Sequence, residues 1–410
     1  MATQRIEHAV RESYGRLIAI LSTRDRDIAA AEDSLADAIV AALEQWPEQG
    51  IPDQPEAWLV AVARRRLIDR ARRNATGAAL ARSLALLSEI SEEPDPAAPR
   101  YPDERLRLLF VCAHPAIDPA VHAPLMLQTV LGLSAARIAA AFIVSPDAMA
   151  RRLTRAKLKI RDAGIGFELP DARELADRLE PVLDAIYAAY GSGWDGLTGD
   201  SRRDDLATEA IWLGRTLNEL LPAQPEALGL LALMLHLEAR RPARRARDGA
   251  YVPLSDQDTG LWSRGLLAEA EATLRRAATF GKTGRYQLEA AIQSAHAGHR
   301  LIGEPDKATI VALYDSLFRR SPRLGVAVGR AAATAEADGA EAGLRLLAAI
   351  DADRVAQYQP FWAVRADLLA RTGGADALGD AILAYDRAIA LAEDPAIRQH
   401  LSERRARLLS

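Results

Sequence analysis

The segment LSAARIAAAFIVSPDAMARRLTRAKLKIR (133–161) has the pattern of two short helices joined by a tight connection. Ser134 and Ser145 are favourable N-cap residues, and Pro146 suits the first turn of the second helix. At helical spacing the second helix has one apolar seam, formed by Met149, Leu153, Ala156 and Ile160. Its basic residues lie on the other faces: Arg151, Arg152, Arg155, Lys157 and Lys159. The segment predicts a helix-turn-helix whose second helix either recognises DNA or is a solvated helix on a bundle surface.

A second basic segment, AWLVAVARRRLIDRARR (57–73), has six arginines between residues 64 and 73. An apolar stripe runs along the same helix through Leu59, Val62, Ala63 and Leu67. Such a local density of arginine is typical of a surface that follows phosphates. Trp58 either stacks on an unpaired base or belongs to the core.

Apolar residues recur at spacings of three and four along nearly the whole chain, and Ala, Leu and Arg dominate. This pattern predicts an all-α protein. The stretch 76–102 is rich in proline, small residues and acidic residues, a composition that suits a linker. We therefore expect two small helical domains at 1–75 and 103–165, a linker at 76–102, and a larger helical extension at 166–410.

The extension contains an internal echo. RAAATAEADG (330–339) aligns with RADLLARTGG (365–374) at an offset of 35 residues. The offset is close to the tetratricopeptide period of about 34, and an amphipathic helix follows each copy. The pattern indicates a stack of paired helices, or else an ordinary bundle with coincidental glycine turns.

The formal net charge of the 410 residues is −4. Residues 1–165 hold 22 Lys+Arg and 21 Asp+Glu, whereas residues 166–410 hold 30 and 35. The acidic excess is therefore confined to the second part and does not exclude nucleic acid as a partner of the first. Because the sequence has one cysteine, no secretory h-region and no apolar run of about 18 residues, we expect a cytoplasmic protein without membrane insertion.

Catalytic signatures are missing from the sequence: it has no phosphate-binding glycine loop, no HExxH and no Gly-x-Ser-x-Gly. Cys112 and His114 supply too few ligands for a zinc site. His296 and His299, near Glu289, are expected to be surface or helix-packing residues. Asp248, Asp256 and Asp258 lack the EF-hand register and are expected to stabilise turns. We therefore expect no enzymatic activity, metal or cofactor.

Several segments carry a family resemblance. An acidic helix ending in Trp46, the loop PEQGIPDQPEA (47–57) and the arginine-rich segment resemble region two of extracytoplasmic-function (ECF) RNA polymerase sigma factors. Residues 103–165 are similar to their region four. DGAYVPLSDQDTGLW (248–262), GRYQLEAAIQSAHA (284–297) and IVALYDSL (310–317) resemble the ECF group with a tetratricopeptide-like C-terminal extension.

The resemblance implies that region two binds the β′ clamp coiled coil of core RNA polymerase and captures the melted minus-ten strand. Region four would read the minus-thirty-five duplex and meet the β flap. The residues at matching polymerase-binding positions are Glu32, Asp33, Asp37 and Trp46. Those at minus-ten positions are Trp58, Arg64, Arg65, Arg70, Arg72 and Arg73. Those at minus-thirty-five positions are Ser145, Arg151, Arg152, Arg155 and Lys157.

This sequence also departs from the family pattern. Ala36 replaces a common Gln, Ile39 replaces a common aromatic residue, and Cys112-Ala113-His114-Pro115 replaces Cys-Cys-His-Pro. An alternative interpretation is therefore a helical protein- or ligand-binding scaffold attached to a degenerate sigma module. In the sigma interpretation the extension regulates activity, either by competing with DNA through its acidic charge, through direct contact, or through a bound regulatory protein.

Overall fold

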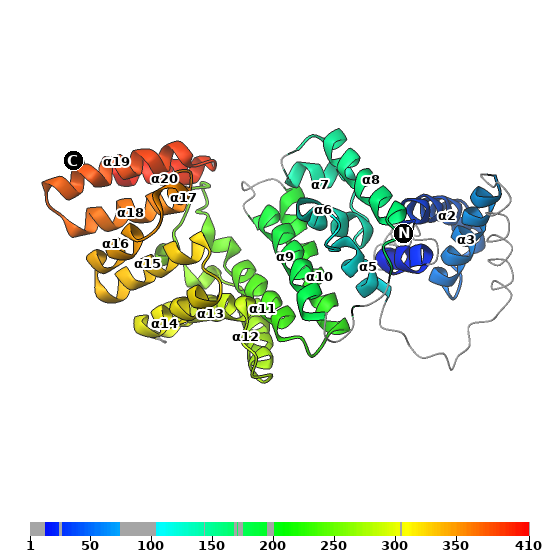
Figure 1. The fold of residues 1–410 in the computed structure, drawn as a ribbon, viewed down its shortest axis with the longest axis horizontal. Coiled ribbons are helices and arrows are strands. Elements are labelled where there is room, and N and C mark those ends of the chain that lie inside the picture. The colour runs from blue at the N-terminus through cyan, green and yellow to red at the C-terminus, as the bar shows by residue number, and fades with distance from the viewer. Residues whose placement is uncertain are drawn as a thin grey trace. The chain divides into compact units, whose positions relative to one another are not determined.

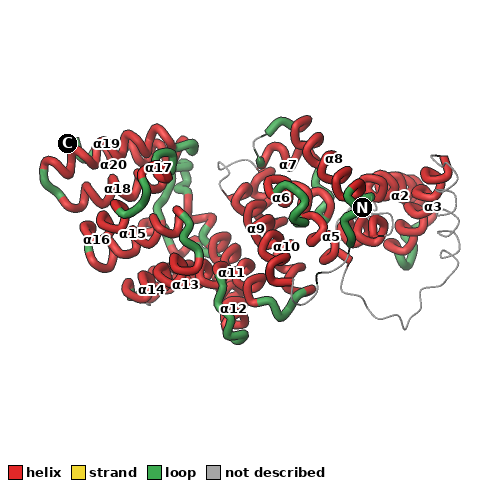
Figure 2. The backbone as a smooth tube through the Cα atoms, in the orientation of Figure 1, coloured by secondary structure: helices red, strands yellow, loops and turns green. Residues whose placement is uncertain are grey.

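The computed structural model describes residues 13–23, 27–73, 104–142, 144–167, 170, 175–194, 201–303 and 306–409. Within these ranges the regular structure is helical, and the only β contact is an isolated bridge between Arg245 and Tyr251 (Figures 1 and 2). The expected all-α fold is confirmed for this part of the chain. Contacts divide the chain into a first compact unit, residues 1–196 with 200–213, and a second, residues 197–199 with 214–410.

The first unit begins with a helix that includes residues 13–23, followed by α2 (Ile28–Gln49) and α3 (Pro55–Arg73). The Asp27 carboxylate accepts a hydrogen bond from the Ala30 backbone N–H at 3.0 Å and caps α2. Gly50, with φ 86°, ends it. The buried apolar residues of α2 recur every three or four positions: Ile28, Ala31, Leu35, Ala38, Ala42 and Trp46. One face of α2 therefore packs against α3.

The other helices described up to residue 194 are α5 (Glu104–Cys112), α6 (Pro119–Thr129), α7 (Ala135–Ala141), α8 (Pro146–Asp162) and α9 (Leu175–Trp194). The Ser134 hydroxyl accepts a hydrogen bond from the Arg137 N–H, and Ser145 accepts one from the Ala148 N–H, both at 3.3 Å. These bonds confirm the two predicted N-caps. The predicted apolar seam of α8 is also buried, as expected.

Helix α9 packs across α6 and buries Leu179, Val182 and Ile186. The contacts therefore group α9 with the first unit, although the sequence suggests that the extension begins at residue 166. The domain limits themselves stay predictions. Removal of α9 would expose apolar surface on α6, so the first unit needs residues beyond 166 for its core.

The acidic excess of residues 166–410 is confined to a shorter segment than the division at residue 166 indicates. Residues 166–213 hold 4 Lys+Arg and 11 Asp+Glu, and residues 214–410 hold 26 and 24. The second compact unit therefore has a formal excess of two positive charges. The negative charge lies in the segment that includes α9 and the start of α10 (Ser201–Leu220).

The core of the second unit is built around α11 (Pro225–Ala239), which is buried on nearly all sides. It packs against α12 (Arg264–Ala278) and α13 (Arg285–Ile302). The Glu226 carboxylate accepts hydrogen bonds from the backbone N–H groups of Tyr286 and Gln287, at 2.9 and 3.2 Å. A residue of α11 thus caps the N-terminus of α13, where a negative charge is favourable.

The remaining helices of this unit follow in order: α14 (Lys307–Arg320), α15 (Leu324–Asp338), α16 (Ala340–Ala348), α17 (Ala352–Val355), α18 (Gln359–Thr372), α19 (Ala375–Leu391) and α20 (Pro395–Ala406). Gly339 and Gly374, which are equivalent in the internal echo, precede α16 and α19 with φ of 94° and 86°. The echo therefore corresponds to repeated helix pairs with the same glycine connection. Their tetratricopeptide identity stays a prediction.

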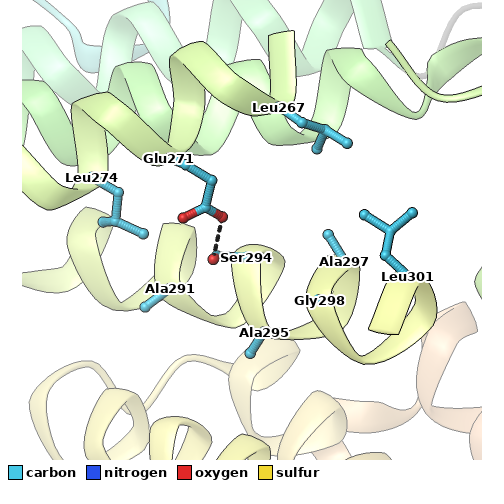
Figure 3. A pocket seen from close by; sticks show the side chains of 9 residues that line it. All are labelled: Leu267, Glu271, Leu274, Ala291, Ser294, Ala295, Ala297, Gly298 and Leu301. Atoms are coloured by element: carbon cyan, nitrogen blue, oxygen red, sulfur yellow. Dashed lines mark hydrogen bonds between the residues drawn. The ribbon is translucent and has the colours of Figure 1, made fainter. Parts of the chain in front are cut away.

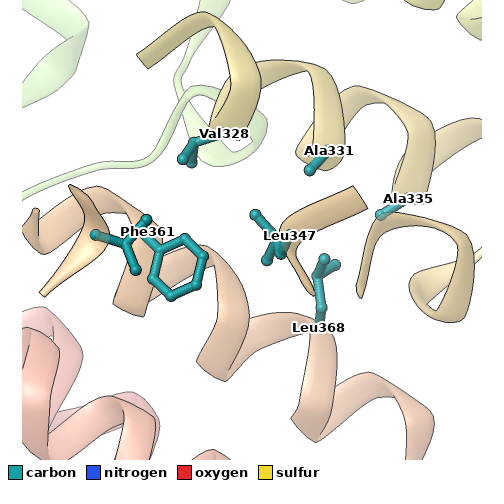
Figure 4. Close-up of a cluster of buried hydrophobic side chains, with 7 residues drawn as sticks. Val328, Ala331, Ala335, Leu347, Phe361 and Leu368 are labelled. Atoms are coloured by element: carbon teal, nitrogen blue, oxygen red, sulfur yellow. The ribbon is translucent and has the colours of Figure 1, made fainter. Parts of the chain in front are cut away.

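A shared core joins consecutive helices of this repeat. Val328 and Ala331 of α15, Leu347 of α16, and Phe361 and Leu368 of α18 form one buried cluster (Figure 4). Each helix pair therefore buries its apolar face against the next, as in solenoid proteins.

The segment between α11 and α12 contains the short 3₁₀ turns Arg241–Arg244, Leu254–Asp256 and Thr259–Leu261. The Asp248 carboxylate accepts a hydrogen bond from the Ala250 N–H at 3.0 Å, and Asp258 accepts one from the Gly260 N–H at 2.8 Å. Both residues have the turn-stabilising role expected from sequence.

A small cavity of about 320 Å³ lies between α12 and α13, and its walls are mainly leucine and alanine (Figure 3). The Ser294 hydroxyl donates a hydrogen bond to Glu271 across this cavity. This bond satisfies the two most polar groups that line it, so the cavity offers little polar recognition.

Candidate functional site

The candidate surface on α2 divides into three environments. Asp37 is exposed. Asp33 is also exposed but forms an ion pair with Arg70 of α3 at 2.7 Å. Glu32 is largely buried and forms an ion pair with Lys157 of α8. Of the acidic residues expected to bind polymerase, Asp37 and Asp33 face solvent, whereas Glu32 takes part in an internal contact.

Trp46 lies in the core and does not present its ring to a partner. Its exposed fraction is 3%, and it packs edge-on against Trp58 with 5.3 Å between ring centroids. Trp46 is the last buried position of the apolar face of α2, so helix packing dictates its burial. This burial does not favour the expected polymerase contact of Trp46, which stays a prediction, whereas Trp58 is partly exposed.

Helix α3 buries Leu59, Ala63 and Ile68 at helical spacing. This orientation leaves Arg64 and Arg65 exposed. Arg70 is also exposed, but its guanidinium donates to Asp33. The side chains of Arg72 and Arg73 lie outside the described residues. Arg64 and Arg65 are thus the expected minus-ten residues of α3 that are exposed without a described ion pair.

Arg66 extends this basic surface, because it is exposed like Arg64 and Arg65. It stands in the same arginine run, but it is absent from the set of expected minus-ten contacts. Helical spacing alone could have predicted that Arg66 is exposed, because it lies three residues after the buried Ala63 and two before the buried Ile68.

The ion pair between Glu32 and Lys157 joins the two expected binding elements. The Lys157 and Glu32 side chains are 9% and 17% exposed. Burial raises the pKa of Glu32, and the charge and hydrogen bond of Lys157 oppose that rise. Burial, and then the charge of Glu32, raises the pKa of Tyr14. The Lys157 ammonium is therefore held inside the first unit.

This environment does not favour the expected DNA contact of Lys157, which stays a prediction. In α8 it follows the buried seam residue Ala156, and docking of α8 on α2 covers it. Arg161 reaches Asp27 of α2 at 3.8 Å as a second, more exposed pair. Arg151, Arg152 and Arg155 are exposed on α8, and their contact with DNA stays a prediction. The Ser145 hydroxyl is engaged in the N-cap.

A close backbone approach also joins the same parts of the first unit. A Cβ atom at Gly15 would overlap the carbonyl oxygen of Val130, which follows α6. Tyr14 in turn lies against Gly132, whose φ is 68°. The helix that includes residues 13–23 is thus fitted closely to the connection between α6 and α7, with no room for a side chain at Gly15.

Local hydrogen bonds engage the Cys112 and His114 side chains. The Cys112 sulfur lies 3.2 Å from the Thr129 hydroxyl, and burial raises the pKa of its thiol to about 12. The His114 Nδ1 accepts a hydrogen bond from the Ala116 N–H at 3.1 Å. Across the described ranges, no three His, Cys, Asp or Glu side chains are grouped as metal ligands.

His296 has the helix-packing role expected from sequence, since it contacts Tyr314 with 6.2 Å between ring centroids. Glu289 is paired with Arg285 at 2.7 Å. Among the helices that the structure describes, none is both long and apolar enough to cross a membrane.

Comparisons with known proteins find two family matches within the chain. Residues 9–76 match the family Sigma-70 region 2, and residues 178–278 match a family of unknown function, DUF6596. An uncharacterized protein of Rhizobium meliloti (strain 1021) is 40% identical over 373 residues, which cover 90% of this chain and 87% of that protein. No solved structure matches the chain. The basic helix α3 and the acidic helix α2 both lie within the Sigma-70 region 2 match.

Proposed function

The chain belongs to the same family as the Rhizobium meliloti protein and has a sigma-70 region 2 domain, and from this premise we propose that it is a sigma factor of the ECF class. It binds core RNA polymerase through α2 and directs promoter recognition and transcription initiation through the arginines of α3 and α8. The main supporting observation is the exposed Arg64–Arg66 run within the region 2 match, beside the exposed Asp37 of the neighbouring helix.

The proposed chemistry is binding and strand capture. Arginine side chains neutralise phosphates and release counterions, so affinity falls steeply as salt rises. The half-buried Trp58 offers a ring face on which a melted base can stack. No step in this proposal makes or breaks a covalent bond.

Reconstituted transcription tests the proposal. Purified chain with bacterial core polymerase should initiate at defined start sites on promoter fragments from its own genome. An Arg64→Glu/Arg65→Glu variant should lose this activity, whereas Arg345→Glu/Arg354→Glu, which changes exposed residues of the second unit by the same charge, should keep it. Absence of specific initiation on every genomic fragment, while a known ECF sigma factor initiates with the same polymerase, would refute the proposal.

A helical scaffold attached to a degenerate sigma module is the second candidate. The internal use of Glu32 and Lys157 and the exposed Ala36 favour it, because they remove polar groups from the expected binding surfaces. An Arg151→Ala/Arg155→Ala variant separates the two functions. The sigma proposal expects loss of minus-thirty-five-dependent initiation, whereas the scaffold expects protein partners to be retained and transcription to be unaffected.

We also propose that the extension regulates the sigma module. A cut at Pro170 is a poor test of this idea, since it would remove α9 from the core of the first unit. Full-length chains with altered surface charge are better suited. Charge neutralisation in residues 175–191, at the exposed Asp177 and Glu180, should raise promoter affinity if acidic charge competes with DNA. Unchanged affinity at low and high salt would contradict competition by this charge.

A further inference from the structure

The second unit encloses a cavity of about 870 Å³ that is distinct from the surfaces of α2, α3 and α8. Helices α13, α14, α15, α18 and α20 each contribute several lining residues, together with Tyr385 of α19. Residues 251–255 of the segment after α11 line the remaining side. The volume lies in the range of pockets for small-molecule ligands, about 300–1,000 Å³.

An ion pair and a neighbouring aromatic contact, together called the clasp, join distant parts of the sequence beside this cavity. Arg245 forms an ion pair with Asp394, the N-cap of α20, across a separation of 149 residues. These side chains are only 15% and 16% exposed. Next to them Tyr251 packs edge-on against His400 of α20, with 5.5 Å between ring centroids. Tyr251 and His400 also line the cavity, so the clasp lies directly beside it, and the volume of the cavity suits a small occupant better than a folded partner.

The charged groups of the lining are unbalanced. Four cationic side chains and two carboxylates line the cavity: Arg300, Lys307, Arg371, Arg404, Glu336 and Asp367. The two carboxylates are shared among three of these cations. Lys307 and Arg371 contact Glu336 at 3.4 and 2.5 Å, while Arg371 and Arg404 both contact Asp367. Arg300 donates instead to the backbone carbonyl oxygen of Gln257 at 3.0 Å. The lining thus retains an excess of two positive charges.

The imidazole of His296 is a further group on the α13 wall of the cavity. Burial, followed by the charge of Arg240 and then His299, lowers the pKa of His296 to about 4. His296 therefore lines the cavity as a neutral hydrogen-bonding group at physiological pH. Arg300 lies one turn further along the same helix, at the exposed rim. An anion entering here would meet Arg300 first and imidazole and tyrosine groups further inside.

We propose that this cavity binds a small organic anion with at least two carboxylate or phosphate groups. Arg300 and Lys307 at the rim bind its charged groups, and the imidazole, tyrosine and aliphatic side chains further inside hold the rest of the molecule. The site lies in the extension, so it goes beyond the proposed promoter-binding function. It gives the extension a ligand whose chemistry matches both the charge excess and the size of the cavity.

Isothermal titration calorimetry of the full-length chain tests this proposal with four probes: citrate, pyrophosphate, hexaglutamate and acetate, at matched ionic strength. Binding of citrate or pyrophosphate well above the acetate control is expected, and the tighter of the two identifies the charged group. Arg300→Gln should weaken that binding at least tenfold, whereas Arg345→Gln on α16, outside the cavity, should leave it unchanged.

Hydrogen exchange provides a second measurement that does not depend on a variant. The bound anion should slow exchange in α13 and α20 and leave α2 unchanged. Failure of citrate and pyrophosphate to exceed acetate would overturn the proposal. So would binding that is indifferent to Arg300→Gln, or hexaglutamate binding tighter than both small anions, since the latter would identify an acidic peptide as the occupant.

Discussion

Replacement of Lys157 by methionine should separate α8 from α2 in a pH-dependent manner. Methionine preserves much of the apolar stem of lysine and removes the ammonium group that faces Glu32. The remaining carboxylate is then largely buried without its cationic partner. Loss of one member of a buried ion pair typically costs about 3–5 kcal/mol, because an uncompensated charge is left inside the protein.

The size of this loss depends on pH because Glu32 can take up a proton. Burial already raises its pKa above the ordinary value of 4.5, and Lys157 is the principal group that opposes the rise. The buried carboxylate can always escape its unfavourable charge by taking up a proton, which costs ~1.36 kcal/mol for each pH unit above its ordinary pKa. The electrostatic loss therefore cannot exceed about 3.4 kcal/mol at pH 7 or about 0.7 kcal/mol at pH 5. A raised folded-state pKa gives stability that is complete below the unfolded-state pKa and is lost as pH rises through the folded-state value. The variant should therefore weaken as pH rises from 5 to 7.

Hydrogen exchange measured by mass spectrometry on the full-length chain provides a local assay, since α2 and α8 yield separate peptides. With exchange rates corrected for pH, Lys157→Met should lower protection of both helices strongly at pH 7 and slightly at pH 5. Glu32→Gln/Lys157→Met should recover much of the loss at pH 7, because it buries no net charge. Arg161→Gln, which removes the more exposed contact with Asp27 at 3.8 Å, should cost less than about 1 kcal/mol. Equal losses at both pH values, or a double variant no better than the single one, would refute this reasoning.

Three further predictions concern the first unit. Gly15→Ala should lower the stability of this unit by about 1–3 kcal/mol, because the added methyl group overlaps the Val130 carbonyl. Chemical denaturation followed by tryptophan fluorescence measures this loss. Gly191→Ala, with open space around the added methyl group, is the control, and similar losses in both variants would contradict the steric explanation. Arg64→Gln/Arg65→Gln should reduce the slope of log affinity against log salt by about 2 in promoter binding by the holoenzyme, and an unchanged slope would exclude phosphate contacts at these positions. The Cys112 thiol, whose pKa burial raises to about 12, should react with iodoacetamide only after unfolding, so rapid labelling of the native protein would contradict its burial.

Local sequence rules predicted α8 well because its determinants lie within a few residues of one another. The Ser145 cap, the proline of the first turn and the buried seam all depend on helical spacing alone. The same rules correctly place Arg151, Arg152 and Arg155 on exposed faces of α8. The cap shows where α8 begins, and the spacing of apolar residues shows which face of the helix is buried. Both can therefore be predicted from the sequence of α8 alone.

Lys157 shows where such rules stop. Helical spacing places it on the border of the seam, where a lysine normally keeps its charge in water. Its burial depends on α2, more than 100 residues earlier, which supplies Glu32. No periodicity within α8 contains that information. Trp46 is the reverse case, because its own helix spacing shows that it belongs to the core, and the family resemblance alone suggested a surface role.

The internal echo identified the repeated helix pairs, but it did not reveal how the second unit ends. A repeat spacing describes neighbours along the chain, whereas the contact between Arg245 and Asp394 joins two segments outside the echo. The cavity lies beside this contact, and helices far apart in the sequence line it. For that reason the candidate anion site could not be found from motifs, and the sequence predicts only surface or helix-packing roles for His296 and His299.

The contact between Arg245 and Asp394 also alters how the second unit should unfold. In a linear array of repeats, stability is approximately a sum over adjacent pairs, and the terminal repeat can fray while the others persist. Here the terminal helix α20 has a second neighbour near the start of the unit, so its detachment removes interactions at both ends of the array. Detachment of α20 therefore costs more free energy than detachment of the last helix in an open array. The unit should melt in one cooperative transition, and loss of residues 394–410 should weaken the segment around residue 245 as much as the helices beside α19.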